Sequence, residues 1–328
     1  MTSLRFGIIG TGHMAGTFAT ELRALRAGGI VATAVGSRRL DAARTFAVLH
    51  QLDRAFGSYE ELAADPHIDI VYVATPPSLH EAHALLCLQS GKHVLCEKPF
   101  ALTALQADRM IDCARSRGRF LMEAMWTRFL PAMEAVRRVI AGGKLGRIQL
   151  IAGGGAFVPA GPPDHHLLQR SLGGGALLDA GVYFVSIVSG LLGSPLRLKA
   201  SGIIGSSGVD EQAVWVTEHT EGAQAICYIS LRSRRAPDLE ILGDHGSIRL
   251  HAPVFCPIRL TISRPGEPDE VQHHPVINGG YGYQVLEAQR CLRLGLGESP
   301  FLPLAETRAV MATMDEIRAQ LGLRYPGE

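Results

Sequence analysis

The chain has 328 residues, of which 47% are hydrophobic and 19% are charged. A chain this apolar can bury a large core, so the composition excludes wholesale disorder, and the length suits two domains or one large α/β domain. The formal net charge is +1 and the sequence contains no basic tract, which argues against a nucleic-acid partner.

Several further classes of protein are excluded by the N-terminal run and by the cysteines. The apolar run that closes at Gly10 is too short, and has the wrong flanks, for a signal peptide. No uninterrupted apolar stretch approaches the ~18 residues that a membrane span needs. The six cysteines lie far apart, and neither His165-His166 nor His273-His274 has a third ligand at a recognisable spacing. We therefore expect a cytoplasmic protein with no disulfide framework, no metal site and no membrane partner.

The first 123 residues alternate strand-like and helix-like segments, which is the pattern of a doubly wound parallel sheet with helices on both faces. Strands are expected at residues 4–9, 30–35, 68–74, 93–96 and 120–122, and helices at 14–25, 40–49, 59–64, 79–89 and 104–117. We therefore assign residues 1–123 to a Rossmann domain.

The character of the sequence changes after a predicted helix at 131–141. Longer strand-like stretches follow, at residues 147–152, 197–204, 213–219 and 223–231. The turn at 220–222 and the turn at 243–246 each join two strand-like segments, which predicts antiparallel hairpins. Residues 124–328 are therefore expected to form an α+β domain for substrate binding and oligomerisation, with a mainly antiparallel, open-faced sheet. Helical periodicity returns at 283–294 and at 304–321, and the last helix is long enough to pack back on the first domain.

A glycine turn follows the first predicted strand and opens the first helix. Its sequence, GTGHMA at residues 10–15, matches the dinucleotide fingerprint with alanine in the third small position. Gly10 would allow the sharp turn, Gly12 would let the backbone approach a pyrophosphate, and Ala15 would permit close helix packing. The alternative is a tight glycine turn without a ligand. The alternating α/β context favours the dinucleotide site.

The residues after the second strand indicate which nicotinamide cofactor is preferred. A carboxylate there suits NAD, whereas an arginine accommodates the 2′-phosphate of NADP. The strand ends in Gly36-Ser37-Arg38-Arg39, and Asp41 is the first carboxylate. This pattern favours NADP, with Arg38 and Ser37 as phosphate ligands. NAD remains the alternative, in which both arginines are solvated and Asp41 caps the next helix.

Glu97-Lys98-Pro99 follows the predicted strand at 93–96, at the edge where open α/β sheets bind ligands. Lys98 can act there as a fixed cation on a loop that Pro99 stiffens. Glu97 is expected to be structural, as a partner for local donors. A solvated surface lysine is the alternative.

These motifs together resemble the Gfo/Idh/MocA oxidoreductases. The resemblance rests on the glycine turn, the loop ATPPSLH at 74–80, Glu97-Lys98-Pro99, and GGGALLDAGVY at 173–183, which is similar to the active-site helix of the family's second domain. It covers nearly the whole chain and implies a homodimer or homotetramer. With the residues above, it implies cofactor contacts by Thr11, His13, Met14, Thr75, Pro76, His80, Glu97 and Lys98.

At Tyr183 the chain departs from the commoner family pattern, which has histidine there. Tyrosine at this position, with MEAMWTRFLP at 122–131, resembles a subgroup that includes dimeric dihydrodiol dehydrogenases and NADP-dependent D-xylose dehydrogenases. The subgroup resemblance also favours NADP. It implies a sugar or related cyclic alcohol as substrate.

The residue types suit this chemistry. Oxidation of an alcohol needs a base for the hydroxyl proton while the cofactor accepts the hydride. A free tyrosine has a pKa of ~10, and a nearby lysine cation lowers it, so Lys98 and Tyr183 form a sensible pair. Asp179 lies four residues before Tyr183, on the same face of an α-helix, where it could bind substrate or orient Lys98. The alternative is that Asp179 caps the helix and Tyr183 belongs to the core.

Three further residues are expected near the substrate or the nicotinamide. Trp126 and Arg128 follow the predicted strand at 120–122, where an aromatic face and a guanidinium could hold a sugar or cyclic diol. Interdomain packing with a salt bridge is the alternative for both. His80 could line the nicotinamide pocket or cap its helix.

The sequence therefore predicts an NADP-dependent dehydrogenase, with Tyr183 as acid/base, Lys98 as its electrostatic partner and the substrate between two domains. A non-catalytic NADP(H)-binding regulator of the same fold is the alternative. Such a regulator would need none of Lys98, Asp179 and Tyr183.

Overall fold

The computed structural model describes residues 3–160 and 165–328, and its contacts divide the chain into two compact units. Unit 1 comprises Met1–Ala101, Leu105–Trp126 and Ile277–Leu304, and unit 2 comprises Leu102–Ala104, Thr127–Val276 and Ala305–Glu328. The first junction lies close to the predicted one at 123. The assignment of all of 124–328 to the second domain needs correction, because residues 277–304 belong to unit 1.

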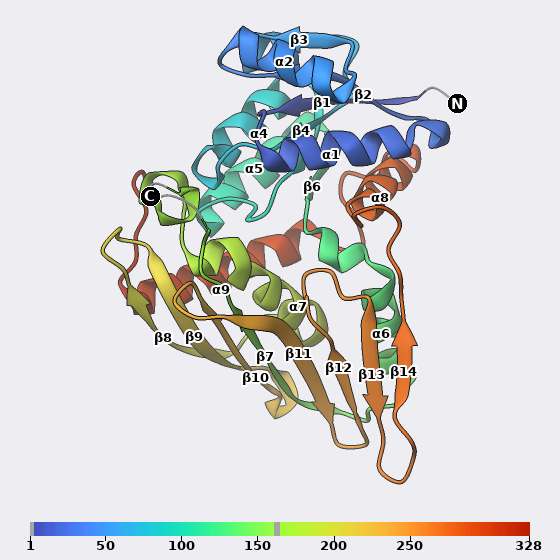
Figure 1. Ribbon diagram of the computed structural model, residues 1–328, viewed down its shortest axis with the longest axis vertical. Helices are drawn as coiled ribbons and strands as arrows, with labels where there is room; N and C mark the ends of the chain where they lie inside the picture. Colours follow the sequence, from blue (N-terminus) through green and yellow to red (C-terminus); the bar gives the residue numbers. More distant parts are fainter. Residues whose placement is uncertain (1–2, 161–164) are drawn as a thin grey trace. The chain divides into compact units, whose positions relative to one another are not determined.

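A six-stranded parallel sheet forms the centre of unit 1, in the order β3-β2-β1-β4-β5-β6 (Figure 1). Its strands are β1 (Leu4–Ile9), β2 (Ile30–Gly36), β3 (Arg54–Phe56), β4 (Ile70–Val73), β5 (His93–Cys96) and β6 (Leu121–Glu123). The doubly wound prediction is confirmed. The strand β3 was not predicted, because three half-buried residues are too few for a periodic pattern.

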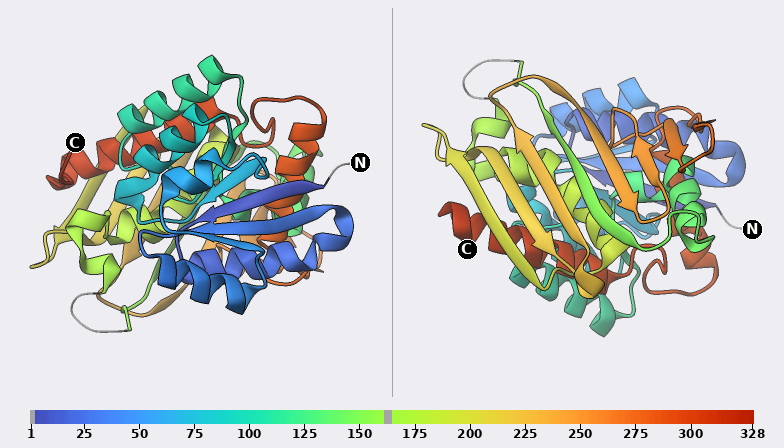
Figure 2. Two further views of the ribbon diagram at one scale, coloured as in Figure 1. Left: turned by 90° about the horizontal axis from the view of Figure 1, so that it is seen from above. Right: turned by 90° about the horizontal axis from the view of Figure 1, so that it is seen from below.

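Helices lie on both sides of this sheet, as Figure 2 (left) shows. They are α1 (His13–Ala24), α2 (Leu40–His50), α3 (Tyr59–Ala64), α4 (His80–Gln89) and α5 (Ala104–Arg117). The strands between them read as continuous apolar runs because both of their faces are buried, and Ile70–Val73 is buried at every position.

The segment 277–304 joins unit 1 through α8 (Gly282–Arg293). The buried carboxylate of Glu21 on α1 accepts the backbone N–H groups of Gly279 (2.7 Å) and Gly282 (3.1 Å). These groups at the start of a helix have no partner within the helix, so the carboxylate caps α8. This cap explains the correction to the domain boundary.

Unit 2 is built on an eight-stranded mixed sheet in the order β14-β13-β12-β11-β7-β10-β9-β8. Its strands are β7 (Ile148–Ala156), β8 (Arg197–Ile204), β9 (Asp210–Glu218), β10 (Gln224–Ser230), β11 (Arg235–Gly243), β12 (Ser247–Leu250), β13 (Arg259–Ser263) and β14 (Glu270–His273). Both predicted hairpins, β9–β10 and β11–β12, are antiparallel, and β7–β10 pair in parallel. The mainly antiparallel prediction is therefore confirmed.

The central strand β7 extends four residues beyond its predicted end at 152. Three consecutive glycines, 153–155, signalled the end of the strand, because glycine weakens a strand interior. In the structure, the ring of Tyr228 and the side chain of Pro237 occupy the space where Cβ atoms of Gly154 and Gly155 would lie. The glycines therefore serve close packing between neighbouring strands.

Unit 2 also contains α6 (Pro131–Ala141), α7 (Val182–Leu192) and α9 (Leu304–Leu321), the last of which lies in unit 2 from Ala305 onward. The helical stretch Arg170–Leu192 has the length and hydropathy of a membrane span, but 72% of its apolar window is buried. Most of this stretch is therefore packed inside the protein. Among the described residues, the sheet face seen in Figure 2 (right) carries no helix.

Candidate active site

The first turn of unit 1 has the geometry of a dinucleotide cradle. Gly10 has φ = +107°, and a Cβ added to it would lie 2.7 Å from the carbonyl oxygen of Ala74 on the neighbouring β4 segment. A side chain is therefore excluded both by the backbone conformation and by the close approach of the two loops. The predicted role of Gly10 in the sharp turn agrees with this geometry.

Gly12 is the N-cap of α1 and faces open space. A Cβ added there would meet nothing within 4 Å, no side chain caps the helix, and its first turn carries no acidic residue. Thr11, His13 and Met14 beside it are partly or fully exposed, whereas Ala15 is buried. Uncapped N–H groups with the positive end of a helix dipole suit a pyrophosphate, so these residues fit the expected dinucleotide.

The two arginines in the loop after β2 have different side-chain partners. Arg39 pairs with Asp41 at 2.6 Å, and this hydrogen-bonded contact lowers the pKa of Asp41 to about 2. Arg39 is the N-cap of α2, so Asp41 is not its cap. Arg38 is exposed and lies beside the Tyr59 hydroxyl, where its charge opposes the rise in the Tyr59 pKa caused by burial.

The loop after β4 is tied down by two histidines. Thr75 Oγ1 lies 2.9 Å from Nδ1 of His83. The buried ring of His80 spans two carbonyl oxygens, with Nε2 2.7 Å from Thr75 and Nδ1 2.8 Å from Pro99. Burial lowers the pKa of His80 to about 4, so the ring is neutral at pH 7. His80 thus links the loop containing Pro76 to the loop after β5, and Leu79, not His80, is the N-cap of α4.

The carboxylate of Glu97 is held by two hydrogen bonds, one of them from the backbone of Lys98. One Glu97 oxygen accepts the Tyr72 hydroxyl and the other accepts the Lys98 backbone N–H at 3.0 Å. Tyr72 is fully buried and stacks on Phe18, with ring centroids 3.6 Å apart. Glu97 is therefore a partner for local donors, as the sequence indicated. Tyr72 was missed, although a tyrosine in a fully buried strand needs a partner for its hydroxyl.

These loops all follow strands of one parallel sheet. The turn after β1, the loop after β2, the loop after β4 and the Glu97-Lys98-Pro99 segment after β5 leave the sheet at its carboxyl edge. The chain reverses strand order there, between β1 and β4, which is where such sheets bind dinucleotides. Unit 1 therefore brings the predicted cofactor residues to one edge.

In unit 2, a π-helical turn, Leu177–Gly181, precedes α7 and contains Asp179. Asp179 is half-buried, Tyr183 is 8% exposed, and the Tyr183 ring lies 5.7 Å from that of Phe255. The α-helical spacing of four residues predicts one shared face for Asp179 and Tyr183. A π turn changes that spacing and occurs often at functional sites, so the shared face no longer follows from the count of four. Phe255 was missed because it lies between predicted elements.

The two substrate candidates after β6 have partners within their own units. Trp126, 4% exposed, stacks on Tyr281 in unit 1, with centroids 4.1 Å apart. Arg128, also 4% exposed, donates in unit 2 to the Ser186 carbonyl at 2.9 Å and pairs with Glu306. The salt bridge of Arg128 thus lies within unit 2 and not between domains, and a role in substrate binding stays a prediction for both residues.

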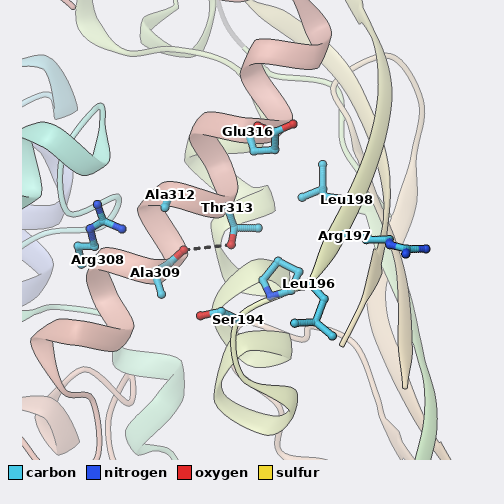
Figure 3. A pocket seen from close by; sticks show the side chains of 10 residues that line it. Ser194, Leu196, Arg197, Leu198, Arg308, Ala309, Ala312, Thr313 and Glu316 are labelled. Atoms are coloured by element: carbon cyan, nitrogen blue, oxygen red, sulfur yellow. Dashed lines mark hydrogen bonds between the residues drawn. The ribbon is translucent and has the colours of Figure 1, made fainter. Parts of the chain in front are cut away.

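A pocket of about 410 Å³ opens in unit 2 between α9 and residues 194–198, which lead into β8 and form its start. Figure 3 shows Arg308, Thr313 and Glu316 on the helix side and Ser194 and Arg197 on the other side. None of the residues that line it is a predicted site residue.

Comparisons with known proteins agree with these two units. Residues 4–125 match the model of an oxidoreductase family with a NAD-binding Rossmann fold, and residues 133–249 match the GFO/IDH/MocA C-terminal domain. The chain belongs to the Gfo/Idh/MocA oxidoreductase family. The resemblance found in the motifs is thereby confirmed.

Individual known proteins are similar to the chain over nearly its full length. The chain is 36% identical to trans-1,2-dihydrobenzene-1,2-diol dehydrogenase of Sus scrofa, covering 99% of this chain and 98% of that protein. Among solved structures, KijD10, a 3-ketoreductase from Actinomadura kijaniata crystallised with NADP, has a TM-score of 0.84 at 26% identity and covers 98% of each chain. Levoglucosan dehydrogenase with NADH and L-sorbose shares the fold, with a TM-score of 0.90 at 21% identity over 98% of this chain and 97% of that one.

Proposed function

We propose that this protein is an NADP-dependent dehydrogenase that moves a hydride between the nicotinamide and a CH–OH group of a sugar or related cyclic alcohol, of the aldose or dihydrodiol type. The observation that carries the proposal is the shared carboxyl edge of unit 1, where an uncapped helix start at Gly12 and the Lys98 loop leave the same parallel sheet. Identity of 36% over nearly the whole length to a dihydrodiol dehydrogenase supports the substrate class.

The preference for NADP rests on the loop after β2. Arg39 already pairs with Asp41, whereas Arg38 is exposed beside Ser37 and Tyr59. A carboxylate engaged by arginine is a poor acceptor for ribose hydroxyls, and an exposed guanidinium suits a 2′-phosphate. Arg38 is therefore the principal ligand of the phosphate. NAD is used less efficiently.

Arg38→Asp tests this preference. A charge-assisted hydrogen bond contributes ~1.5–3 kcal/mol, so the Kd of NADPH should rise roughly ten- to hundredfold while that of NADH changes little. Arg39→Asp is the matched control, since Arg39 faces Asp41. An unchanged NADPH Kd in Arg38→Asp would remove Arg38 from the site.

The proposed mechanism assigns one task to each polar side chain. Tyr183, as phenolate, takes the hydroxyl proton of the substrate, and the Lys98 ammonium favours that phenolate. Asp179 accepts a hydrogen bond from a substrate hydroxyl or orients Lys98. The nicotinamide, when bound, supplies the hydride acceptor. In the reverse direction the Tyr183 hydroxyl returns the proton to the carbonyl oxygen.

The decisive experiment is a panel of D-xylose, D-glucose, inositol and a trans-dihydrodiol with NADP and with NAD. We expect turnover with at least one of them, and a loss of roughly 10²–10⁴-fold in kcat for Tyr183→Phe, the usual contribution of general acid–base catalysis. Wild-type rates in Tyr183→Phe would displace it as acid/base. Tight NADPH binding with no turnover on a broad polyol panel would favour the regulator.

We further propose a cytoplasmic homodimer or homotetramer, assembled through the helix-free face of the sheet in unit 2. Val214, Val216 and Ile226 lie on this face and are 38%, 38% and 42% exposed. Val216 and Ile226 are directly opposite each other on β9 and β10. A second copy that covers this patch would remove apolar surface that monomers seldom expose.

A further inference from the structure

A buried carboxylate stands at the start of the helix that carries Asp179 and Tyr183. Asp210, the first residue of β9, is 0% exposed, and its Oδ2 accepts the backbone N–H of Leu177 at 2.7 Å. The N–H of Ala176 also points to this carboxyl group. Asp210 thus holds the first turn of the helix from another strand, in place of a local cap.

Gly175 and Tyr325 border the space that the carboxylate occupies. Gly175 has φ = +125°, and a Cβ there would overlap Asp210 Oδ1. The Tyr325 hydroxyl would lie 3.1 Å from the same Cβ, and it donates to the Gly174 carbonyl at 2.6 Å. The glycine run before the helix therefore admits Asp210 to the helix start, and a larger residue at 175 would displace it.

We propose that Asp210 is a positioning residue for the active site. Its carboxylate fixes where the helix starts, and so sets the placement of Asp179 in the π turn and of Tyr183 one residue into α7. This inference rests on the proposed function, in which these two side chains meet the substrate.

Stability alone does not account for Asp210. Burial raises its pKa to about 7, against the opposing effect of the Leu177 hydrogen bond, and Oδ1 has no donor in the described structure. The ionisable groups that face it are Arg318 on α9 and Tyr325 beyond that helix. A folded-state pKa above the unfolded value means that stability contributed by this group is lost as pH rises from about 4 to 7. The ionised side chain therefore costs stability at neutral pH while it holds the helix.

Asp210→Asn and Asp210→Ala test the proposal in the full-length protein. Asparagine keeps the shape and one acceptor, whereas alanine removes the cap. The matched control is Asp244, whose Oδ1 also accepts a backbone N–H, from Arg147 at 2.9 Å, and would also be overlapped by a Cβ on a positive-φ glycine, Gly146. Asp244 lies in the turn between β11 and β12 and carries no site residue.

We expect Asp210→Ala to lower kcat at least tenfold with an unchanged Kd for NADPH. Asp210→Asn should keep most of the wild-type kcat. Because asparagine does not ionise, we expect the kcat of Asp210→Asn to change less with pH than that of wild type, and its thermal stability above pH 7 not to fall below wild type. Both Asp244 variants should keep wild-type kcat. Wild-type kcat in Asp210→Ala, or an equal fall in Asp244→Ala, would overturn the proposal.

Hydrogen exchange separates this inference from the proposed function, because it needs no turnover. Backbone amides of residues 176–183 should exchange at least tenfold faster in Asp210→Ala than in wild type, while those of α6 keep their rates. If the wild-type protein has no dehydrogenase activity but the exchange rates change in Asp210→Ala, the proposed function is wrong while the role of Asp210 at the helix start is supported. Unchanged exchange rates in Asp210→Ala would show that Asp210 does not hold the start of the helix.

Discussion

At the scale of single residues, Gly10 and Gly12 have different roles: the fold requires Gly10, whereas Gly12 leaves space for a ligand. Both belong to one fingerprint, yet only Gly10 has positive φ and a carbonyl where its side chain would lie. Gly12 has an ordinary φ of −79° and open space beside it. The motif predicted both roles from the sequence. Which glycine the fold itself requires became visible only with the neighbouring Ala74 loop.

Alanine substitutions at the two positions should therefore have opposite consequences. Gly10→Ala should unfold at lower temperature, since a left-handed backbone costs an L-residue ~1–2 kcal/mol before the clash is counted. Gly12→Ala should keep the Tm of the apo protein and weaken NADPH binding at least tenfold. Thermal melts with and without NADPH, together with fluorescence titration, provide the check. Equal Tm values for both variants would contradict the distinction.

Tyr72 and Glu97 form the second pair at this scale. Burial and the Glu97 carboxylate hold the pKa of Tyr72 well above its usual value, so its hydroxyl stays protonated and donates. Tyr72→Phe would leave a buried carboxylate with one donor fewer, a loss of about 1–3 kcal/mol. Urea unfolding measures it. Tyr228→Phe is the control, since its hydroxyl contacts Arg235 at the exposed sheet face, and a similar loss there would argue against a special role of burial.

At the scale of elements, His80 connects two loops of the ligand edge. Its folded pKa of about 4 lies below the unfolded value of 6.5. Between pH 6.5 and 4, His80 is mostly protonated in the unfolded chain and mostly neutral in the folded protein. The contribution of His80 to stability is therefore complete above pH 6.5 and is lost as pH falls toward 4. Each pH unit in this window corresponds to about 1.4 kcal/mol.

His80→Gln should consequently show a flatter decline of unfolding free energy between pH 6.5 and 4.5 than wild type. His50, His83 and His93 also have pKa values lowered by burial, but they are present in both proteins and cancel in the difference. Denaturant titrations at four pH values provide the measurement. Parallel curves would show that His80 is not held neutral by the fold.

The sequence predicts an element well when the signals that form it are local, and poorly when they come from residues distant in the chain. Helices such as α3 and α5 match their predicted bounds, because caps and apolar spacing are local signals. The π turn at 177–181 has no such signal, since Asp210 that holds its start is about thirty residues away along the chain. The same holds for β7, whose glycines read as a break until Tyr228 and Pro237 are beside them. Non-local partners decided each error.

At the scale of the whole molecule, the helix-free face of unit 2 carries the prediction of assembly. Ile226→Glu places a charge among exposed valines on that face and should convert the proposed dimer to monomers, visible by size-exclusion chromatography with light scattering. Leu49→Glu is the control, because Leu49 is 70% exposed on α2 of unit 1. A monomeric wild-type protein at micromolar concentration would contradict the assembly.

The discontinuity of unit 1 has a consequence for biosynthesis. Helix α8, which Glu21 caps, and Gly297, whose carbonyl accepts the N–H of Leu121 on β6, both come from the segment that follows nearly all of unit 2 in the chain. A nascent polypeptide emerges from the ribosome N-terminus first, so the six strands are available long before their last helix. Unit 1 is therefore begun first but cannot be completed until most of unit 2 has been synthesised, and a truncated chain that stops at residue 276 lacks the segment that completes it.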